Sequence, residues 1–222
     1  TVNGEIIGTA TSTGGTVTID IPGQVPPDQM LVTITKQDYY RYTALVDVIP
    51  PTGPYVVRES YTINDATGGN GNGMMDYGET NLLSLTVENV GVQQANNVDV
   101  TLSTNDAYIT ITDGTENYGN IAAGATAVIT DGFEYDVAGD IPDGHNALFT
   151  VEATDGTDIW SSSFSIEGHA PVLEFVDFTI SDATGNNNGK IDPGETVEIT
   201  IEIENTGSAD AYNIDGDLSV VD

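Results

Sequence analysis

Two segments of the chain combine Asp, Asn, Gly and Glu at a spacing that suits a bound cation. The segment from Asp182 to Glu195 reads DATGNNNGKIDPGE, and the segment from Asp65 to Glu79 has nearly the same order of residues. Calcium takes six to eight oxygen ligands at about 2.3–2.6 Å, from carboxylates, amides and backbone carbonyls. A loop supplies them by alternating oxygen-bearing residues with small ones, so we expect each segment to be a calcium loop.

The register of these segments is that of a twelve-residue EF-type loop. If Asn188 takes the fifth position, Gly189 falls on the tight turn at the sixth and Glu195 on the bidentate twelfth. The first position, usually Asp, is Gly68 or Thr184 here, so we expect the nearest preceding acid to reach in from the strand end. The predicted ligands are Asp65, Asn70, Asn72, Met74, Asp76 and Glu79 in the first loop and Asp182, Asn186, Asn188, Lys190, Asp192 and Glu195 in the second, Met74 and Lys190 through their carbonyls.

A simpler interpretation is that these residues only make turns, with Glu79 and Glu195 accepting backbone hydrogen bonds. Two loops with the same residue types at one spacing favour calcium over turns alone. Magnesium suits a flexible loop with many protein oxygens less well than the larger ion. Each loop comes early in its segment of the chain, so we expect the ion to order the entry to each module.

The loops belong to a longer internal repeat with an offset of about 117 positions. One additional residue in the first copy lowers the offset by one within the loop. The matched stretches are 61–68 with 178–185, 76–80 with 192–196, and 88–91 with 204–207, and a weaker match joins 31–35 to 148–152.

The repeat length is that of an immunoglobulin-sized module. We expect residues 1–53 to be the rear part of an Ig-like domain, 54–169 a complete repeat, and 170–222 the front part of a second copy. Proline steps at Pro50-Pro51 and His169-Ala170-Pro171 are typical of short, stiff joints between such units.

Alternating apolar and polar residues predict strands in each copy. Leu83, Leu85 and Val87 alternate with polar residues, and the stretch from Val197 to Ile203 has the clearest pattern of this kind. We find no convincing helix pattern. The predicted fold is all-β, made of tandem Ig-like antiparallel β-sandwich modules with acidic calcium-type loops.

The charge of the chain limits the classes of partner that it can bind. Four Lys and Arg against 35 Asp and Glu give a net charge of −31, which repels nucleic acid and anionic lipid. No apolar run approaches the ~18 residues of a membrane span, so we expect no membrane insertion. The surplus charge repels itself unless cations or salt screen it, although a solubilising acidic surface is the alternative interpretation.

No pattern in the chain predicts catalysis. Cysteine is absent, and His145 and His169 lack a second His at metal-ligand spacing, so we expect no enzyme activity in this chain. Trp160 is predicted to lie in the core, with a sugar platform as the less favoured alternative. Tyr39, Tyr40 and Tyr42 are predicted to form an exposed aromatic cluster.

Several short motifs resemble a known group of surface proteins. Residues 76–79 (DYGE), 141–145 (IPDGH), 169–171 (HAP) and 192–196 (DPGET) are similar to the Ig-like modules that follow the catalytic domain of gingipain-type cysteine peptidases in Bacteroidota. The resemblance implies export by the type IX route to the cell surface or beyond. It transfers no peptidase activity, because no Cys–His dyad has a matching position here.

We therefore expect a non-catalytic extracellular spacer, structural or adhesive, built from calcium-stabilised Ig-like repeats. Its expected partners are neighbouring modules or copies of itself, with a protein or glycan ligand left open. Because the two ends match opposite parts of one repeat, strand complementation between copies would make a filament, whereas an excerpt of a longer chain is the favoured explanation. The alternative function is that of accessory modules for a gingipain-type peptidase.

Overall fold

The computed structural model describes residues 5–24, 29–48 and 52–219, and within them the chain is all β, without a helix. Most strands contain the β-branched and aromatic residues that fit a pleated, half-buried surface. The strands are β1 (Gln29–Ile34), β2 (Tyr42–Asp47), β3 (Val56–Asn64), β4 (Met75–Asp76), β5 (Thr80–Asn89), β6 (Ala95–Thr104), β7 (Ile109–Asp113), β8 (Thr115–Ile121), β9 (Thr126–Val137), β10 (Asn146–Thr154), β11 (Ile159–His169), β12 (Leu173–Ser181) and β13 (Glu198–Asn205).

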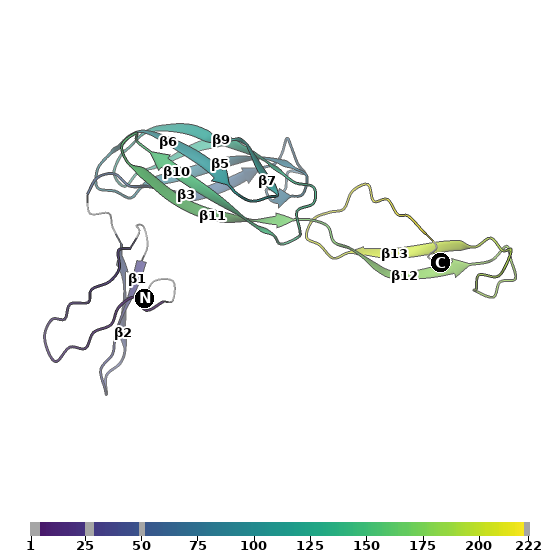
Figure 1. Cartoon of the computed structure of the whole chain (residues 1–222), viewed down its shortest axis with the longest axis horizontal. Coiled ribbons are helices and arrows are strands. Elements are labelled where there is room, and N and C mark those ends of the chain that lie inside the picture. The colour runs from purple at the N-terminus through teal and green to yellow at the C-terminus, as the bar shows by residue number, and fades with distance from the viewer. Residues whose placement is uncertain (1–4, 25–28, 49–51, 220–222) are drawn as a thin grey trace.

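Strands β3 to β11 form two sheets packed face to face, as in a β-sandwich (Figure 1). One sheet has the order β4-β11-β10-β6-β8 and the other the order β3-β5-β9-β7. All of their pairings are antiparallel except the short pairing of β4 with the end of β11. The predicted all-β, antiparallel class is therefore confirmed.

The core lies between these sheets and follows the period-two pattern of the strands. Leu83, Leu85 and Val87 of β5 have no exposed surface, which confirms the predicted inward face of this strand. The rings of Phe149 in β10 and Phe164 in β11 stack at 5.3 Å between centroids. Burial of side chains of this size stabilises the folded state by about 1.5–3 kcal/mol each.

Two shorter sheets lie on either side of the sandwich in the chain. Strands β1 and β2 form an antiparallel hairpin, and β12 pairs with β13. Ile201 and Ile203 of β13 are each 47% exposed, so the predicted alternation is present but its apolar face is half open. The Pro50-Pro51 joint predicted from the sequence lies outside the described residues.

Matched positions of the repeat share local irregularities. The β3–β5 ladder shifts between Arg58 and Ser60, and the β12–β13 ladder shifts 117 positions later, between Phe175 and Asp177. Asn89 accepts the backbone N–H of Tyr55 and of Gly91, and Asn205 accepts the matched donors of residues 172 and 207. The same side chain therefore fixes the same turn twice.

The structure corrects one expectation about the first loop. Residues 65–79 follow β3, whose nine residues carry the chain about 30 Å away from its entry. The loop leads directly into β4, which pairs with the last residues of β11. It therefore lies where the chain leaves the sandwich, and the prediction that its ion would order the entry segment is wrong, because sequence order does not reveal which end a long strand reaches.

Across the described ranges, the structure has no helix long and apolar enough to cross a membrane.

Candidate metal centre

Asp65 organises the first loop from its base. It is 2% exposed and follows directly after β3. Its carboxylate accepts backbone N–H groups from Gly71 (2.9 Å), Asn72 (3.1 Å) and Gly73 (3.0 Å). Gly71 and Gly73 adopt φ of 80° and 76°, a left-handed region that glycine enters without strain. Asp65 thus reaches into the loop from the strand end, and the glycines let the backbone curl around it.

Two asparagine side chains converge on Asp76 at the centre of the loop. Asn70 and Asn72 donate their side-chain amides to Asp76 Oδ2, at 2.6 and 2.7 Å. Their amide oxygens accept the backbone N–H groups of Asn72 and Met74. Three oxygen-bearing side chains are therefore gathered at one point, as the spacing of the sequence predicts.

Glu79 closes the loop from the other side. Its Oε1 accepts the backbone N–H of Asn70 at 2.9 Å, and the residue is 9% exposed. Burial raises the pKa of Glu79; the N–H of Asn70 opposes this shift, and the charges of Asp76 and Asp65 add to it. A cation close to the Glu79 carboxylate would offset the same repulsion.

Two buried carboxylate oxygens of this loop have no hydrogen-bond partner in the described structure. They are Asp76 Oδ1 and Glu79 Oε2, on residues that are 3% and 9% exposed. A buried charged oxygen without a donor is costly, and native proteins satisfy such groups with water or an ion. These two oxygens are therefore placed to accept a hydrogen bond from water or to bind a cation.

The second loop repeats this hydrogen-bond pattern. Glu195 Oε1 accepts the N–H of Asn186 at 2.9 Å, and the amides of Asn186 and Asn188 reach Asp192 Oδ2 at 2.7 and 2.8 Å. Asp182, 2% exposed, accepts the N–H groups of Asn188 and Gly189. Glu195 Oε2 is likewise buried without a partner among the described residues.

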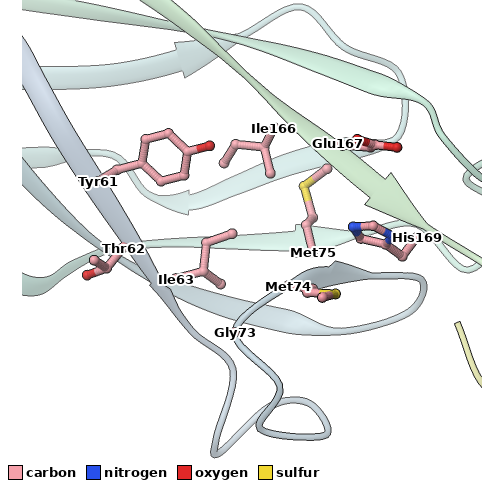
Figure 2. Close-up of a pocket in the computed structure, with 9 residues that line it drawn as sticks. All are labelled: Tyr61, Thr62, Ile63, Gly73, Met74, Met75, Ile166, Glu167 and His169. Atoms are coloured by element: carbon pink, nitrogen blue, oxygen red, sulfur yellow. The ribbon is translucent and has the colours of Figure 1, made fainter. Parts of the chain in front are cut away.

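Met74 and Lys190 occupy the position predicted to offer a backbone carbonyl. Each donates its N–H to the asparagine two residues earlier, at 2.7 and 2.8 Å. The Met74 side chain is 46% exposed and lines a neighbouring groove (Figure 2). The structure therefore places both residues in the loop backbone, where only a carbonyl could serve a cation.

The donor set suits a hard cation more than a transition metal. No three His, Cys, Asp or Glu side chains in the described ranges form a metal-holding group by themselves. A cation in either loop would therefore need amide and backbone oxygens in addition to the carboxylates. Such mixed oxygen sets are typical of calcium.

Two polar residues beneath the first loop were missed by the sequence analysis. Asn81 and Tyr135 face each other across β5 and β9, and both are fully buried. The Asn81 amide and the Tyr135 hydroxyl have no hydrogen-bond partner in the described structure. Burial and the nearby charges of Tyr61, Asp65 and Glu79 raise the pKa of Tyr135. The sequence did contain a signal for Asn81, because it lies on the apolar side of the alternating β5 pattern, where side chains are expected to be buried.

The aromatic residues singled out in the sequence lie where they were predicted to lie. Trp160 is 6% exposed and packs near Tyr55, which places it in the core as predicted and leaves no open face for a sugar. Tyr39, Tyr40 and Tyr42 are 61–102% exposed, as expected for an exposed cluster.

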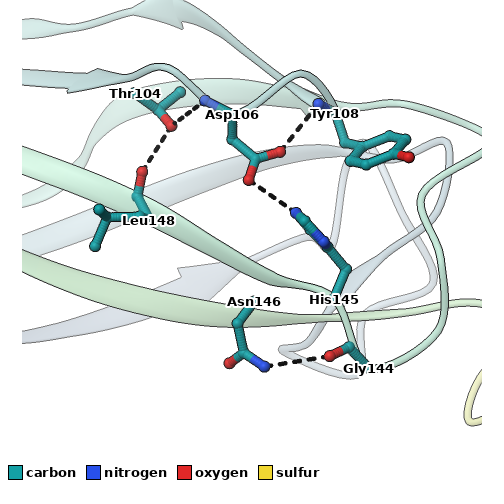
Figure 3. A network of polar contacts seen from close by, with 7 residues as sticks. All are labelled: Thr104, Asp106, Tyr108, Gly144, His145, Asn146 and Leu148. Atoms are coloured by element: carbon teal, nitrogen blue, oxygen red, sulfur yellow. Dashed lines mark hydrogen bonds and ion pairs between the residues drawn. The ribbon is translucent and has the colours of Figure 1, made fainter.

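His145 belongs to a clasp between two turns (Figure 3). Its Nε2 lies 2.8 Å from Asp106 Oδ2, and Asp106 also accepts the N–H of Tyr108. Thr104 ties the same turn to the carbonyl of Leu148 at 2.7 Å. This network joins the β6–β7 turn to the start of β10, and its contacts are those of residues that stabilise the fold.

A groove of about 490 Å³ lies beside the first loop (Figure 2). Its lining includes Tyr61 and Ile63 of β3, Ile166 of β11, and Met74 and Met75. The groove is mainly apolar and its lining includes no catalytic constellation.

No known family model matches this chain, and no curated protein matches it in sequence.

Proposed function

We propose that this chain is a non-catalytic, extracellular spacer made of Ig-like repeat modules, in which each acidic loop binds calcium. The ion stabilises the sandwich end that carries the loop. Display at a cell surface, export by the type IX route and a role in adhesion are parts of the proposal that rest on the resemblance of short motifs alone.

One observation carries the calcium proposal. In both loops a glutamate ends the segment, accepts the N–H of the matched asparagine through Oε1, and keeps a buried Oε2 without a described partner. Turn formation alone needs only the bonded oxygen. A second, unpaired carboxylate oxygen buried at the same place in two loops is what a bidentate calcium ligand requires.

The direct test is thermal melting of the full chain in calcium and in chelator. Binding to the native state at a hundredfold excess over the dissociation constant stabilises it by about 2.7 kcal/mol. For a unit of about 100 residues this corresponds to roughly a 10 °C increase in Tm. Elemental analysis of the dialysed protein should find calcium at the same time.

Matched variants assign the effect to the loops. The double variant Glu79→Gln with Glu195→Gln should lose the calcium-dependent rise in Tm. Its Tm in chelator should stay level or increase, because the buried negative charge at residue 79 is removed. Glu152→Gln, at an exposed position of β10, is the control for charge and should keep the full rise. Equal melting with calcium and chelator, together with no bound calcium, would reject the proposal.

A further inference from the structure

The first loop faces the segment that follows the sandwich. The Tyr77 N–H, directly after β4, donates to the carbonyl of His169 at 2.9 Å, where β11 ends. The Tyr77 hydroxyl donates to the carbonyl of Asp210 at 3.2 Å. One residue of the loop therefore contacts both the last strand of the sandwich and a turn beyond β13.

Asp143 holds the same turn from a second side. It accepts the backbone N–H of Ala170 at 3.1 Å and of Ser208 at 3.2 Å, and it also accepts the Ser208 hydroxyl. His169 Nδ1 lies 2.7 Å from that hydroxyl oxygen. The position of the turn against the loop is thus fixed by several directed contacts.

A hollow of about 370 Å³ lies between loop and turn. The loop contributes Asp76 and Glu79, whose unpartnered buried oxygens are described above, and the turn contributes Asp210 and Tyr212. The Tyr212 hydroxyl lies 3.3 Å from the Asp210 carboxylate.

We propose that Asp210 is an additional ligand of the first loop's cation, directly or through a water molecule, so that the ion bridges the sandwich and the following segment. The inference rests on the proposed calcium function of the loop. It extends the site beyond the residues that the loop spacing predicts, to an acid about 130 positions later in the chain. Calcium coordination by six to eight oxygens leaves room for such a ligand. Without a cation between them, the Asp210 carboxylate and the acidic residues of the loop repel each other.

The first test measures calcium affinity in a full chain carrying Glu195→Gln, so that only the first loop binds. Adding Asp210→Asn should weaken calcium binding by about tenfold, as for supporting groups around metal sites. Asp215→Asn removes the same charge from an exposed position of the same segment and should leave the affinity unchanged. Equal affinities for the two variants would overturn the inference.

The second test measures the joint itself. The chain has no cysteine, so Glu152→Cys and Thr200→Cys provide the only two labelling sites for a distance measurement across the joint. Calcium should narrow the distance distribution in the labelled chain and leave it broad when Asp210→Asn is added. A distribution that narrows equally in both would overturn the bridging role.

The two proposals fail in different ways. If the Glu195→Gln chain binds calcium and Asp210→Asn changes neither affinity nor distances, the bridging role is wrong and the calcium loop stands. If the Glu195→Gln chain binds no calcium, both are wrong.

Discussion

Single glycines determine whether the loop glutamates can reach their positions. A Cβ on Gly69 would lie 2.4 Å from Glu79 Cδ and 2.6 Å from each carboxylate oxygen. A Cβ on Gly185 would lie 2.4 Å from Glu195 Oε1. Neither glycine has a positive φ, so the close approach of the carboxylate, rather than the backbone conformation, requires them.

Gly69→Ala should therefore displace Glu79 and weaken the first loop. Gly69 is exposed and the group it would meet is the end of a flexible side chain, so the loss of stability should be at most about 1 kcal/mol, below the roughly 1–3 kcal/mol typical of an overpacked core. Calcium affinity of the first loop should decrease as well, because the displaced carboxylate gives up its bond to the N–H of Asn70. Calcium titration and thermal melting measure the two effects.

Gly139→Ala is the matched control for this substitution. A Cβ there would meet no heavy atom within 4 Å, and its φ is not in the left-handed region. It should leave calcium affinity unchanged and stability equal or slightly higher, since alanine restricts the unfolded chain. If Gly69→Ala behaves like this control, Glu79 is not held in the position described.

Loop residues were more predictable from sequence than their surroundings. The register placed Asp76 and both asparagines together because their order along one short loop determines their proximity. Asn81 and Tyr135 meet beneath it only through the pairing of β5 with β9, and Asp210 through the path of the chain beyond β13. Contacts between residues far apart in sequence depend on strand order, which a local pattern does not contain.

At the scale of elements, strand alternation made the all-β class predictable. The pattern of Leu83, Leu85 and Val87 requires one buried face, and the structure buries it. The position of the first loop was not predictable in this way. It depends on the length of β3 and on the short parallel pairing of β4 with β11, two residues long in β4, for which the sequence has no distinctive pattern.

The clasp between the β6–β7 turn and the start of β10 should respond to acid. Partial burial favours the protonated form of Asp106, but hydrogen bonds from His145 and from the Tyr108 N–H together lower its pKa below the usual 3.8. A lowered folded-state pKa contributes stability that is present above the unfolded-state value and is lost as pH falls through the folded one. Asp106→Asn should therefore cost about 1 kcal/mol at pH 7 and progressively less below pH ~4.

Urea unfolding of both proteins between neutral and acidic pH measures this difference. Asp113→Asn, an exposed acid at the end of β7, is the control and should follow the wild-type curve. A constant difference between Asp106→Asn and wild type at every pH would show that the carboxylate charge has no part in the clasp.

At the scale of the whole molecule, the net charge of −31 opposes folding through self-repulsion. In chelator, raising NaCl from about 0.05 to 0.5 M should raise Tm by about 5 °C, because screening lengths fall well below 10 Å. Millimolar calcium changes screening little, so any rise it adds reflects binding at specific sites. Magnesium at the same ionic strength is the control and should add less than calcium.

No dependence of Tm on NaCl would mean that the acidic surface is fully solvated and does not stress the fold. Equal shifts with magnesium and calcium would mean that the loops do not select the larger ion.

The chain enters the sandwich at the start of β3 and leaves it at the end of β11, at opposite ends of the long axis (Figure 1). Tension applied to the chain on both sides would therefore run along the strands. It would load the hydrogen bonds of the β3–β5 and β10–β11 ladders together, in shear, instead of opening them one after another. The sandwich is thus oriented to resist stretching, and the first loop lies at the point where that force passes to the next segment.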